Sequence, residues 1–255
     1  MKERMITGVV LALILLGAFL MGNQALFLLM VIFLGIGSYE IYRTKKESLA
    51  PIMIPIYGLI VVLGAFIPAE YFIAYYSAMV LIYFTLAIIF KWFTFDQISY
   101  SFVMTSLLVG AGIGLNAVLA LDRMVFLYVL IASFATDIFA YFGGRQFGKH
   151  KLIERLSPNK TVEGAISGYV MGVVLSFTFG YFMIQSFVDI RIIVVASLLM
   201  PLFSQIGDLS FSLVKRRFNI KDFGTIFPGH GGVLDRIDSV VFAVLTFNIV
   251  LTILS

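Results

Sequence analysis

The chain has 255 residues, of which 61% are hydrophobic and 13% are charged, and its mean hydropathy is +1.04. A water-soluble fold needs a polar exterior that this composition does not supply, so a soluble domain is excluded. The formal net charge is +4, and the absence of cysteine excludes disulfides and thiolate metal ligands. The sequence therefore predicts an all-α, polytopic membrane protein.

Apolar windows long enough to form spanning helices, about 20 residues each, occur along the whole chain. They cover roughly residues 5–22, 24–42, 52–68, 71–90, 98–121, 124–142, 162–187, 191–214 and 237–254. The first window follows a basic start but lacks a small-residue cleavage site, so we expect it to be retained. The pattern predicts about nine transmembrane helices.

The distribution of Lys and Arg predicts the orientation of these helices. With the N-terminus inside, 16 of the 18 basic residues fall in cytoplasmic segments, and only Arg123 and Arg191 fall outside. This asymmetry predicts a cytoplasmic N-terminus and an external C-terminus. We expect residues 1–121 to form structural, lipid-facing helices where dimerisation is possible, and residues 122–255 to form the catalytic membrane region.

Two loops, at about residues 143–161 and 215–236, are longer than the others. Both are cytoplasmic in the predicted topology, basic and glycine-containing, so chemistry is expected at the inner membrane face. Ser157 or Thr161, with Glu163 nearby, is expected to cap the helix that follows the first loop.

Two aspartates lie inside predicted spans, where an ionisable side chain is costly and usually lines a polar cavity. They are Asp137 and Asp208, each one to two turns from the cytoplasmic end of its span. Ser212 follows Asp208 at i+4 and shares its helix face. Such oxygen ligands suit a hard cation such as Mg²⁺. The alternatives are that Asp137 is neutralised by a nearby Arg or Lys and that Asp208 forms a salt bridge to another helix.

The start of the last span carries two more carboxylates, Asp235 and Asp238, three residues apart on one helix face. Together they are candidates to bind a cation, although a helix N-terminus favours acidic residues for its dipole alone. His230, Gly231 and Gly232 precede them. The glycines allow close approach of backbone N–H groups to an anion, while His230 has phosphate contact and packing as equal alternatives.

Basic side chains of the two loops are candidate phosphate contacts, and the alternative for all of them is topology or attraction to anionic headgroups. They are Arg145, Lys160, Lys215, Arg216, Lys221 and Arg236. Carboxylates combined with cations and glycine amides suit a divalent metal and a polyphosphate in an in-line displacement. A Walker-type site is excluded because G-x-x-x-x-G-K-[ST] is missing.

Residues 212–238 read S-x-[apolar]-K-R-x₄-K-D-x-G-x₂-F-P-x-H-G-G-x₂-D-R-[apolar]-D. This pattern resembles the signature of the phosphatidate cytidylyltransferases, also called CDP-diacylglycerol synthases. The resemblance extends to residues 137–145, 147–151, 157–164 and 207–208. It covers the C-terminal half firmly, and the N-terminal half only in hydropathy and number of spans.

The resemblance implies that CTP and phosphatidate react to give CDP-diacylglycerol and pyrophosphate with Mg²⁺, and with a possible second cation such as K⁺. It implies that Asp208 and Asp235 hold the metals. From the residues themselves, Asp137 is a weaker metal candidate, and Lys215 and Asp238 are further candidate catalytic residues. The resemblance also implies a homodimer. The compact chain favours the cell membrane, and the basic loops predict a site that faces the cytoplasm. Nucleic acid is not an expected partner.

The chain departs from the family pattern at two positions. Ile138 stands where Thr or Ser is common, and Asn159 stands where Lys is common. These differences concern details of binding and not the reaction class.

Three other functions compete with this interpretation. A polyprenol or phytol kinase that uses CTP shares intramembrane aspartates and basic loops, but not the complete pattern. A CDP-alcohol phosphotransferase requires D-G-x₂-A-R…G-x₃-D-x₃-D, which is missing. A cation-coupled transporter or channel predicts acidic residues throughout the membrane depth, whereas here they cluster towards one face.

Overall fold

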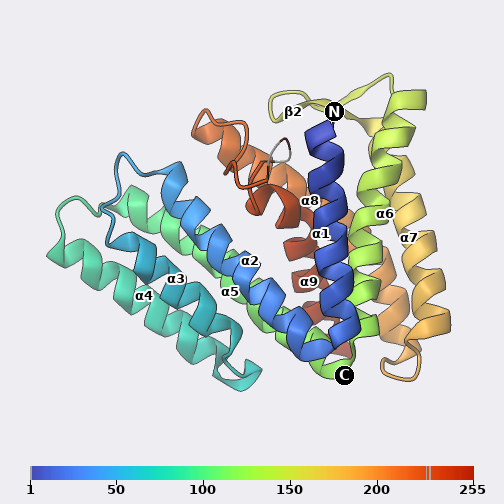
Figure 1. Cartoon of the computed structure of the whole chain (residues 1–255), viewed down its shortest axis with the longest axis horizontal. Coiled ribbons are helices and arrows are strands. Elements are labelled where there is room, and N and C mark those ends of the chain that lie inside the picture. The colour runs from blue at the N-terminus through green and yellow to red at the C-terminus, as the bar shows by residue number, and fades with distance from the viewer. Residues whose placement is uncertain (1, 228, 230) are drawn as a thin grey trace. The chain divides into compact units, whose positions relative to one another are not determined.

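A computed structural model of the chain describes residues 2–227, 229 and 231–255, with side chains except at residues 2–6 and 69. Nine α-helices, one 3₁₀ turn and one two-stranded sheet occur within these described ranges (Figure 1). Their bounds are α1 Lys2–Met21, α2 Asn23–Thr44, α3 Met53–Ala65, η1 Ala69–Tyr71, α4 Phe72–Ile89, α5 Phe95–Leu121, α6 Arg123–Phe147, β1 Lys151–Ile153, β2 Ser157–Thr161, α7 Val162–Met183, α8 Ile190–Arg217 and α9 Leu234–Leu254.

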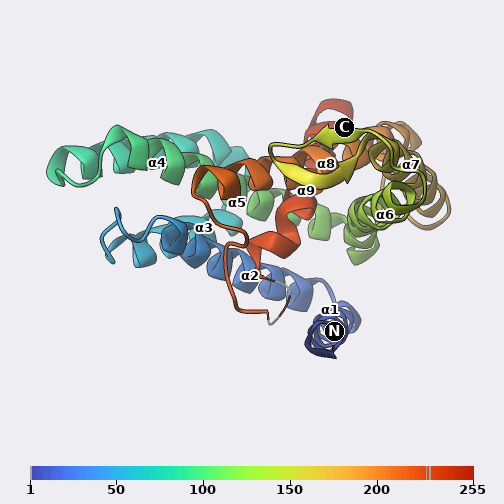
Figure 2. The ribbon, with the colours of Figure 1, turned by 90° about the horizontal axis from the view of Figure 1, so that it is seen from above.

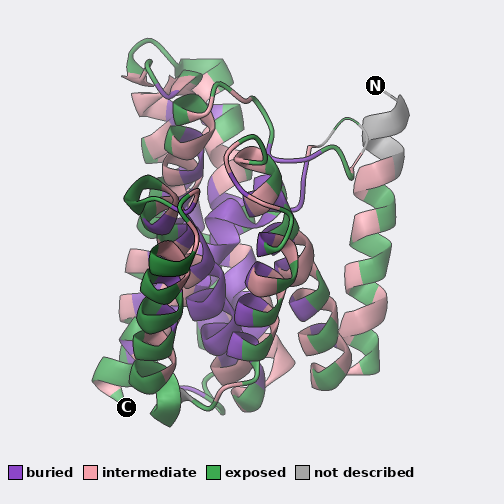
Figure 3. Cartoon of the chain, turned by 90° about the vertical axis from the view of Figure 1, so that its left-hand side faces the viewer, coloured by how far each residue is buried: buried purple, intermediate pink, exposed green. Residues whose placement is uncertain are grey.

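Seven helices in the described part of the chain, α2 and α4–α9, are long and apolar enough to cross a membrane. Exposed residues occur along the helices (green in Figure 3), and many of them are large and apolar, as expected for lipid-facing surfaces. The fold is that of an all-α polytopic membrane protein. Helix α3 has 13 residues and is about 20 Å long, shorter than the hydrocarbon core of about 30 Å. The count of nine spans therefore stays a prediction.

The first of two compact units comprises residues 1–117 and 220–236. Its helices α2–α5 run side by side (Figures 1 and 2). Buried tyrosines join α3 and α4 to α5, because Tyr57 is hydrogen-bonded to Ser101 and Tyr83 to Thr105. These bonds satisfy polar groups that would be costly to bury alone.

The second unit comprises residues 118–219 and 237–255. It contains α6, α7, α8, the β1–β2 hairpin and most of α9. The two units are defined by how the chain packs and not by function. The loop before α9 belongs to the first unit. The functional boundary expected near residue 121 stays a prediction.

Helix α7 buries a stripe of small residues at intervals of four, Gly164, Gly168, Gly172, Ser176 and Gly180. The stripe lets α7 approach α6 and α8 closely. A Cβ at Gly168 would lie 2.5 Å from the carbonyl oxygen of Thr136 and 2.8 Å from the Cβ of Ala140. Small residues that allow backbones to approach are typical of helix contacts in membranes.

We expect Gly168→Ala to destabilise the second unit. Overpacking costs about 1–3 kcal/mol, which exceeds the gain of about 1 kcal/mol in helix propensity. The control is Gly58→Ala, because the nearest atom to a Cβ there is Ser38 Oγ at 4.0 Å. The midpoints of thermal unfolding in detergent should fall for Gly168→Ala and not for Gly58→Ala. Equal midpoints for both variants would contradict the close α6–α7 packing.

The first long loop is shorter than predicted and contains an antiparallel hairpin. Helix α6 continues through Gly143 and Gly144 to Phe147. These glycines do not end the helix, because their role is to let the first turns of α7 pack closely against α6. A Cβ at Gly143 would lie 2.5 Å from Ser167 Oγ. Strands β1 and β2 then pair with Lys151 opposite Thr161.

The cap predicted for α7 is confirmed. The Oγ1 of Thr161 accepts a hydrogen bond from the backbone N–H of Gly164 at 3.1 Å. Glu163 accepts bonds from the backbone N–H groups of Lys149 and His150 and pairs with the His150 ring. These bonds fix the start of α7 and the entry of the hairpin.

Candidate functional site

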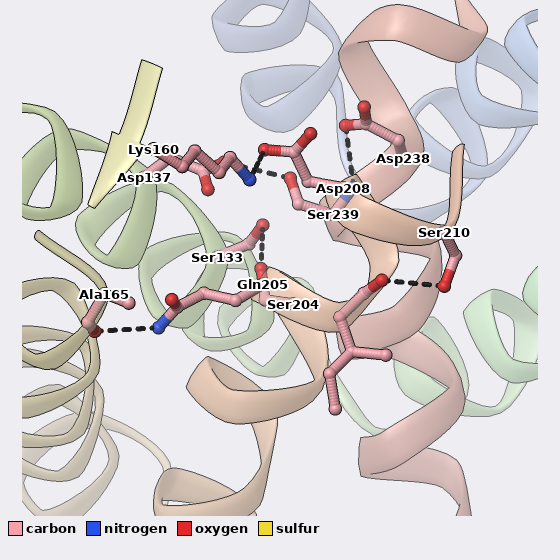
Figure 4. Close-up of polar contacts among 11 residues, drawn as sticks. Ser133, Asp137, Lys160, Ala165, Ser204, Gln205, Asp208, Ser210, Asp238 and Ser239 are labelled. Atoms are coloured by element: carbon pink, nitrogen blue, oxygen red, sulfur yellow. Dashed lines mark hydrogen bonds and ion pairs between the residues drawn. The ribbon is translucent and has the colours of Figure 1, made fainter. Parts of the chain in front are cut away.

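Three carboxylates, Asp137 on α6, Asp208 on α8 and Asp238 on α9, lie within the second unit (Figure 4). The Oγ of Ser239 donates to Asp137 Oδ2 at 3.0 Å. Asp238 is buried, and the charges of Asp208 and Asp137 both act on its carboxylate. The cluster thus concentrates negative charge within the second unit, where a cation is favoured.

A lysine from the hairpin contacts this cluster. The Nζ of Lys160, on β2, is hydrogen-bonded to Asp208 Oδ2 in an ion pair (Figure 4). The alternative of an ion pair at Asp208 is thus realised, but with the hairpin and not with another helix. Lys160, a predicted phosphate contact, is brought to a predicted metal ligand. A cationic group already lies against this carboxylate, which shows that the position accepts positive charge.

The position of Asp208 is fixed by close packing around α8. A Cβ at Gly207 would lie 2.8 Å from the carbonyl oxygen of Asp238, so glycine allows α8 and α9 to approach there. Gln205 Nε2 donates to the carbonyl of Ala165 at 3.1 Å (Figure 4). Ser212, expected on the same face as Asp208, is buried one turn further along α8.

Two basic residues at the end of α8, Lys215 and Arg216, interact with other parts of the second unit. Arg216 Nε donates to the carbonyl of Leu156, between the two strands, at 3.1 Å. The charge of Lys215 acts on Asp238. Arg145, in the last turn of α6, is exposed. The structure therefore brings Lys215 to the carboxylates and uses Arg216 to support the hairpin.

In the first unit, Asp235 organises the chain before α9. Its Oδ2 accepts hydrogen bonds from the backbone N–H of Phe223 at 2.8 Å and of Gly232 at 2.9 Å. Gly231 has φ +86° and its N–H donates to the carbonyl of Phe227 at 3.1 Å. The left-handed φ explains glycine at this position. Contact of the backbone N–H groups of Gly231 and Gly232 with a phosphate stays a prediction.

The remaining predicted residues of this segment are exposed or outside the described ranges. Lys221 and Arg236 are exposed. His230 lies outside the described residues. Helix α9 begins at Leu234, three residues earlier than predicted, so Asp235 lies in its first turn.

Glu40 is a residue that the sequence prediction missed. It is fully buried on α2, and its Oε1 and Oε2 accept hydrogen bonds from the backbone N–H of Val233 at 2.9 Å and of Leu234 at 2.8 Å. The available signal was an ionisable residue inside the predicted span 24–42. Glu40 lies near the end of that window, where ionisable residues are common, so its position alone did not indicate a special role.

Within the described residues, no group of three or more His, Asp or Glu side chains is arranged to hold a metal ion. Mg²⁺ in phosphate-transfer sites is usually held by one or two carboxylates together with substrate phosphates and water. Each unit by itself has a donor of that type. Asp208 in the second unit offers a carboxylate beside a lysine, and Asp235 in the first unit offers one beside backbone N–H groups. The residue chemistry therefore fits a hard divalent cation held jointly with a polyphosphate.

Comparison with known proteins decides the family. The sequence pattern of the cytidylyltransferase family matches residues 2–254. The chain belongs to this family. A phosphatidate cytidylyltransferase of Bacillus subtilis is 31% identical over 258 residues, covering 95% of this chain and 94% of that protein.

Two further relatives share a shorter region with this member of the cytidylyltransferase family. A phosphatidate cytidylyltransferase of Staphylococcus haemolyticus is 41% identical over 125 residues, covering 49% of this chain and 48% of that protein. One of Haemophilus influenzae is 45% identical over 125 residues, covering 48% of this chain and 43% of that protein. The resemblance read from the motifs is thus confirmed at the level of the family.

Proposed function

We propose that this chain is a phosphatidate cytidylyltransferase, which transfers CMP from CTP to phosphatidate and releases pyrophosphate. The observation that carries the proposal is the relationship to the Bacillus subtilis protein of that name along nearly the whole of both chains. The half-buried carboxylate of Asp208, the lysine paired with it and the buried carboxylates of Asp235 and Asp238 supply groups that this chemistry needs. A phosphate oxygen of phosphatidate attacks the α-phosphorus of CTP, and the bond from that phosphorus to the bridging oxygen of pyrophosphate breaks.

In this reaction the residues of the chain bind and orient charged groups. Asp208 and Asp235, with Asp137 as a weaker candidate, would hold Mg²⁺, which neutralises phosphate charge when bound. Lys160 and Lys215 contact phosphate oxygens, and Asp238 keeps Lys215 in place. Phosphatidate is already ionised at neutral pH, so attack needs no strong general base. A second cation such as K⁺ and a homodimer are also part of the proposal.

The proposed topology puts the N-terminus and both long loops in the cytoplasm and the C-terminus outside. It is supported by the distribution of basic residues, 16 of 18 on one side when nine spans are assumed. CTP is then supplied from the cytoplasm and phosphatidate from the membrane. The proposed site faces the compartment that contains the soluble substrate.

The proposal is tested by transfer of label from [α-³²P]CTP into chloroform-soluble lipid. Purified protein in detergent with phosphatidate and Mg²⁺ should label the lipid, and EDTA should abolish labelling. A parallel reaction with [γ-³²P]CTP and a polyprenol acceptor detects the competing kinase activity. Label from the γ position without label from the α position would replace the proposed function with the kinase.

A further inference from the structure

The part of the α8–α9 connection that belongs to the first unit is supported by one face of α2 (Figure 2), and its described residues are 220–227, 229 and 231–233. Phe33, Gly37, Glu40 and Arg43 lie at intervals of three or four residues and therefore share a helix face. Each of them contacts the connection or the start of α9. Helix α2 belongs to the N-terminal half, for which the sequence predicts only structural, lipid-facing roles.

The apolar contacts on this face hold the connection near α2. The rings of Phe33 and Phe227 are 6.3 Å apart in an edge-to-face arrangement. A Cβ at Gly37 would lie 2.9 Å from Leu234 Cδ2, so the glycine admits the first residue of α9. At the end of α2, Arg43 Nη1 donates to Thr225 Oγ1 at 3.3 Å. Contacts of three different kinds thus point to the same segment.

Glu40 lies at the centre of this face and performs the role of a helix cap. The first N–H groups of a helix have no partner within the helix, and an N-cap side chain usually accepts from them. Val233, the residue before α9, has no side-chain oxygen. The Glu40 carboxylate instead accepts from the N–H groups of Val233 and Leu234, and its negative charge suits the positive end of the helix dipole.

The surrounding glycines show that the site is shaped for this carboxylate. A Cβ at Gly224 would overlap Glu40 Oε1, and a Cβ at Gly232 would lie 2.6 Å from Glu40 Oε2. Both glycines belong to the 212–238 motif, so part of that motif is explained by α2 and not by substrate. The N–H of Gly232 in turn donates to Asp235 at 2.9 Å, which links the Glu40 contact to a proposed metal ligand one residue into α9.

We infer that Glu40 is a positioning residue, which caps α9 from α2 and thereby fixes Asp235 and the glycine turn before it. The inference rests on the proposed function for its effect on turnover, but the capping contact is testable without it. The carboxylate of Glu40 is bonded to backbone N–H groups of Val233 and Leu234. Its role is to hold the backbone that carries Asp235.

The test compares Glu40→Gln with wild type by hydrogen–deuterium exchange and by turnover. A glutamine has one acceptor oxygen and keeps the volume of the side chain, so one of the two N–H groups is left opposite an NH₂ group. Exchange in peptides that cover residues 231–236 should become at least about tenfold faster. Loss of a supporting contact around a metal ligand typically costs about 10–100-fold in activity or metal affinity, so we expect lower kcat and a higher requirement for Mg²⁺.

Two other variants separate positioning from general loss of folding. Gly224→Ala would place a Cβ against the same carboxylate and should produce the same local increase in exchange. Glu47→Gln removes an exposed carboxylate just beyond the end of α2 and should match wild type in exchange and turnover. Exchange elsewhere in the chain serves as the control for folding.

Each outcome has a distinct meaning. Unchanged exchange at residues 231–236 in Glu40→Gln would overturn the capping role. Faster exchange with unchanged kcat and Mg²⁺ requirement would overturn the positioning role. If wild type transfers no CMP while Glu40→Gln still accelerates local exchange, the proposed function fails and the capping contact stands.

Discussion

Replacing Asp235 with Asn is expected to reduce turnover by about 100-fold or more, equivalent to about 2.7 kcal/mol of transition-state stabilisation. Asn is nearly isosteric, and its Oδ1 can replace the oxygen that accepts from Phe223 and Gly232. The backbone before α9 is therefore preserved, while the negative charge proposed to hold Mg²⁺ is lost. The measurement is transfer of [α-³²P]CMP to phosphatidate across a range of Mg²⁺ concentrations.

The matched control is Asp96→Asn. Asp96 lies in the first turn of α5, as Asp235 does in α9, but Asp96 is exposed whereas Asp235 is buried. The control variant should turn over like wild type, because loss of a favourable dipole interaction at an exposed helix start costs well under about 1 kcal/mol of stability. Wild-type turnover in Asp235→Asn would remove this residue from the proposed metal site.

The helical membrane fold was predictable from sequence because it depends on long apolar windows. The windows at 124–142 and 162–187 correspond to α6 and α7, with ends displaced by a few residues. The displacement at Gly143 and Gly144 has a physical cause. Glycine both ends helices and allows them to pack closely, and only the contact with α7 distinguishes the two.

The candidate acidic residues were also predictable, because an ionisable carboxylate inside a span is costly and usually lines a polar cavity. Asp137 and Asp208 were selected in this way, and Asp238 was selected for its place at the start of the last span. All three lie in the second unit. Their partners were not predictable. Ser239 bonded to Asp137 and Lys160 paired with Asp208 are contacts between segments about 100 and 48 residues apart, and no local pattern encodes them.

Glu40 shows a different limit of sequence reading. Its partners are backbone N–H groups, which every residue except proline has, so the sequence around residues 233 and 234 gives no sign of a carboxylate partner. The only sequence sign is the absence of a capping side chain at Val233. A helix start without a cap in a buried position requires an acceptor from elsewhere, and that requirement is a usable signal.

The ion pair between Lys160 and Asp208 gives the second large prediction. Asp208→Asn removes the proposed metal ligand and should also lower kcat by about 100-fold or more. Lys160→Ala should chiefly raise the KM for CTP, by about tenfold or more, because a hydrogen bond to a charged group contributes about 1.5–3 kcal/mol. Residues in contact are not additive, so the double variant should lose less than the sum of the two free-energy losses.

Exposed neighbours in the same hairpin region provide the controls. Glu154→Gln and Lys149→Ala remove exposed charges of the same sign as Asp208 and Lys160, and both should keep wild-type kcat and KM. If Lys160 only neutralised Asp208, its removal from the Asp208→Asn variant would leave the KM for CTP unchanged. A further rise in KM in that background is expected instead, because the phosphates of CTP lose a cationic partner whether or not Asp208 is charged.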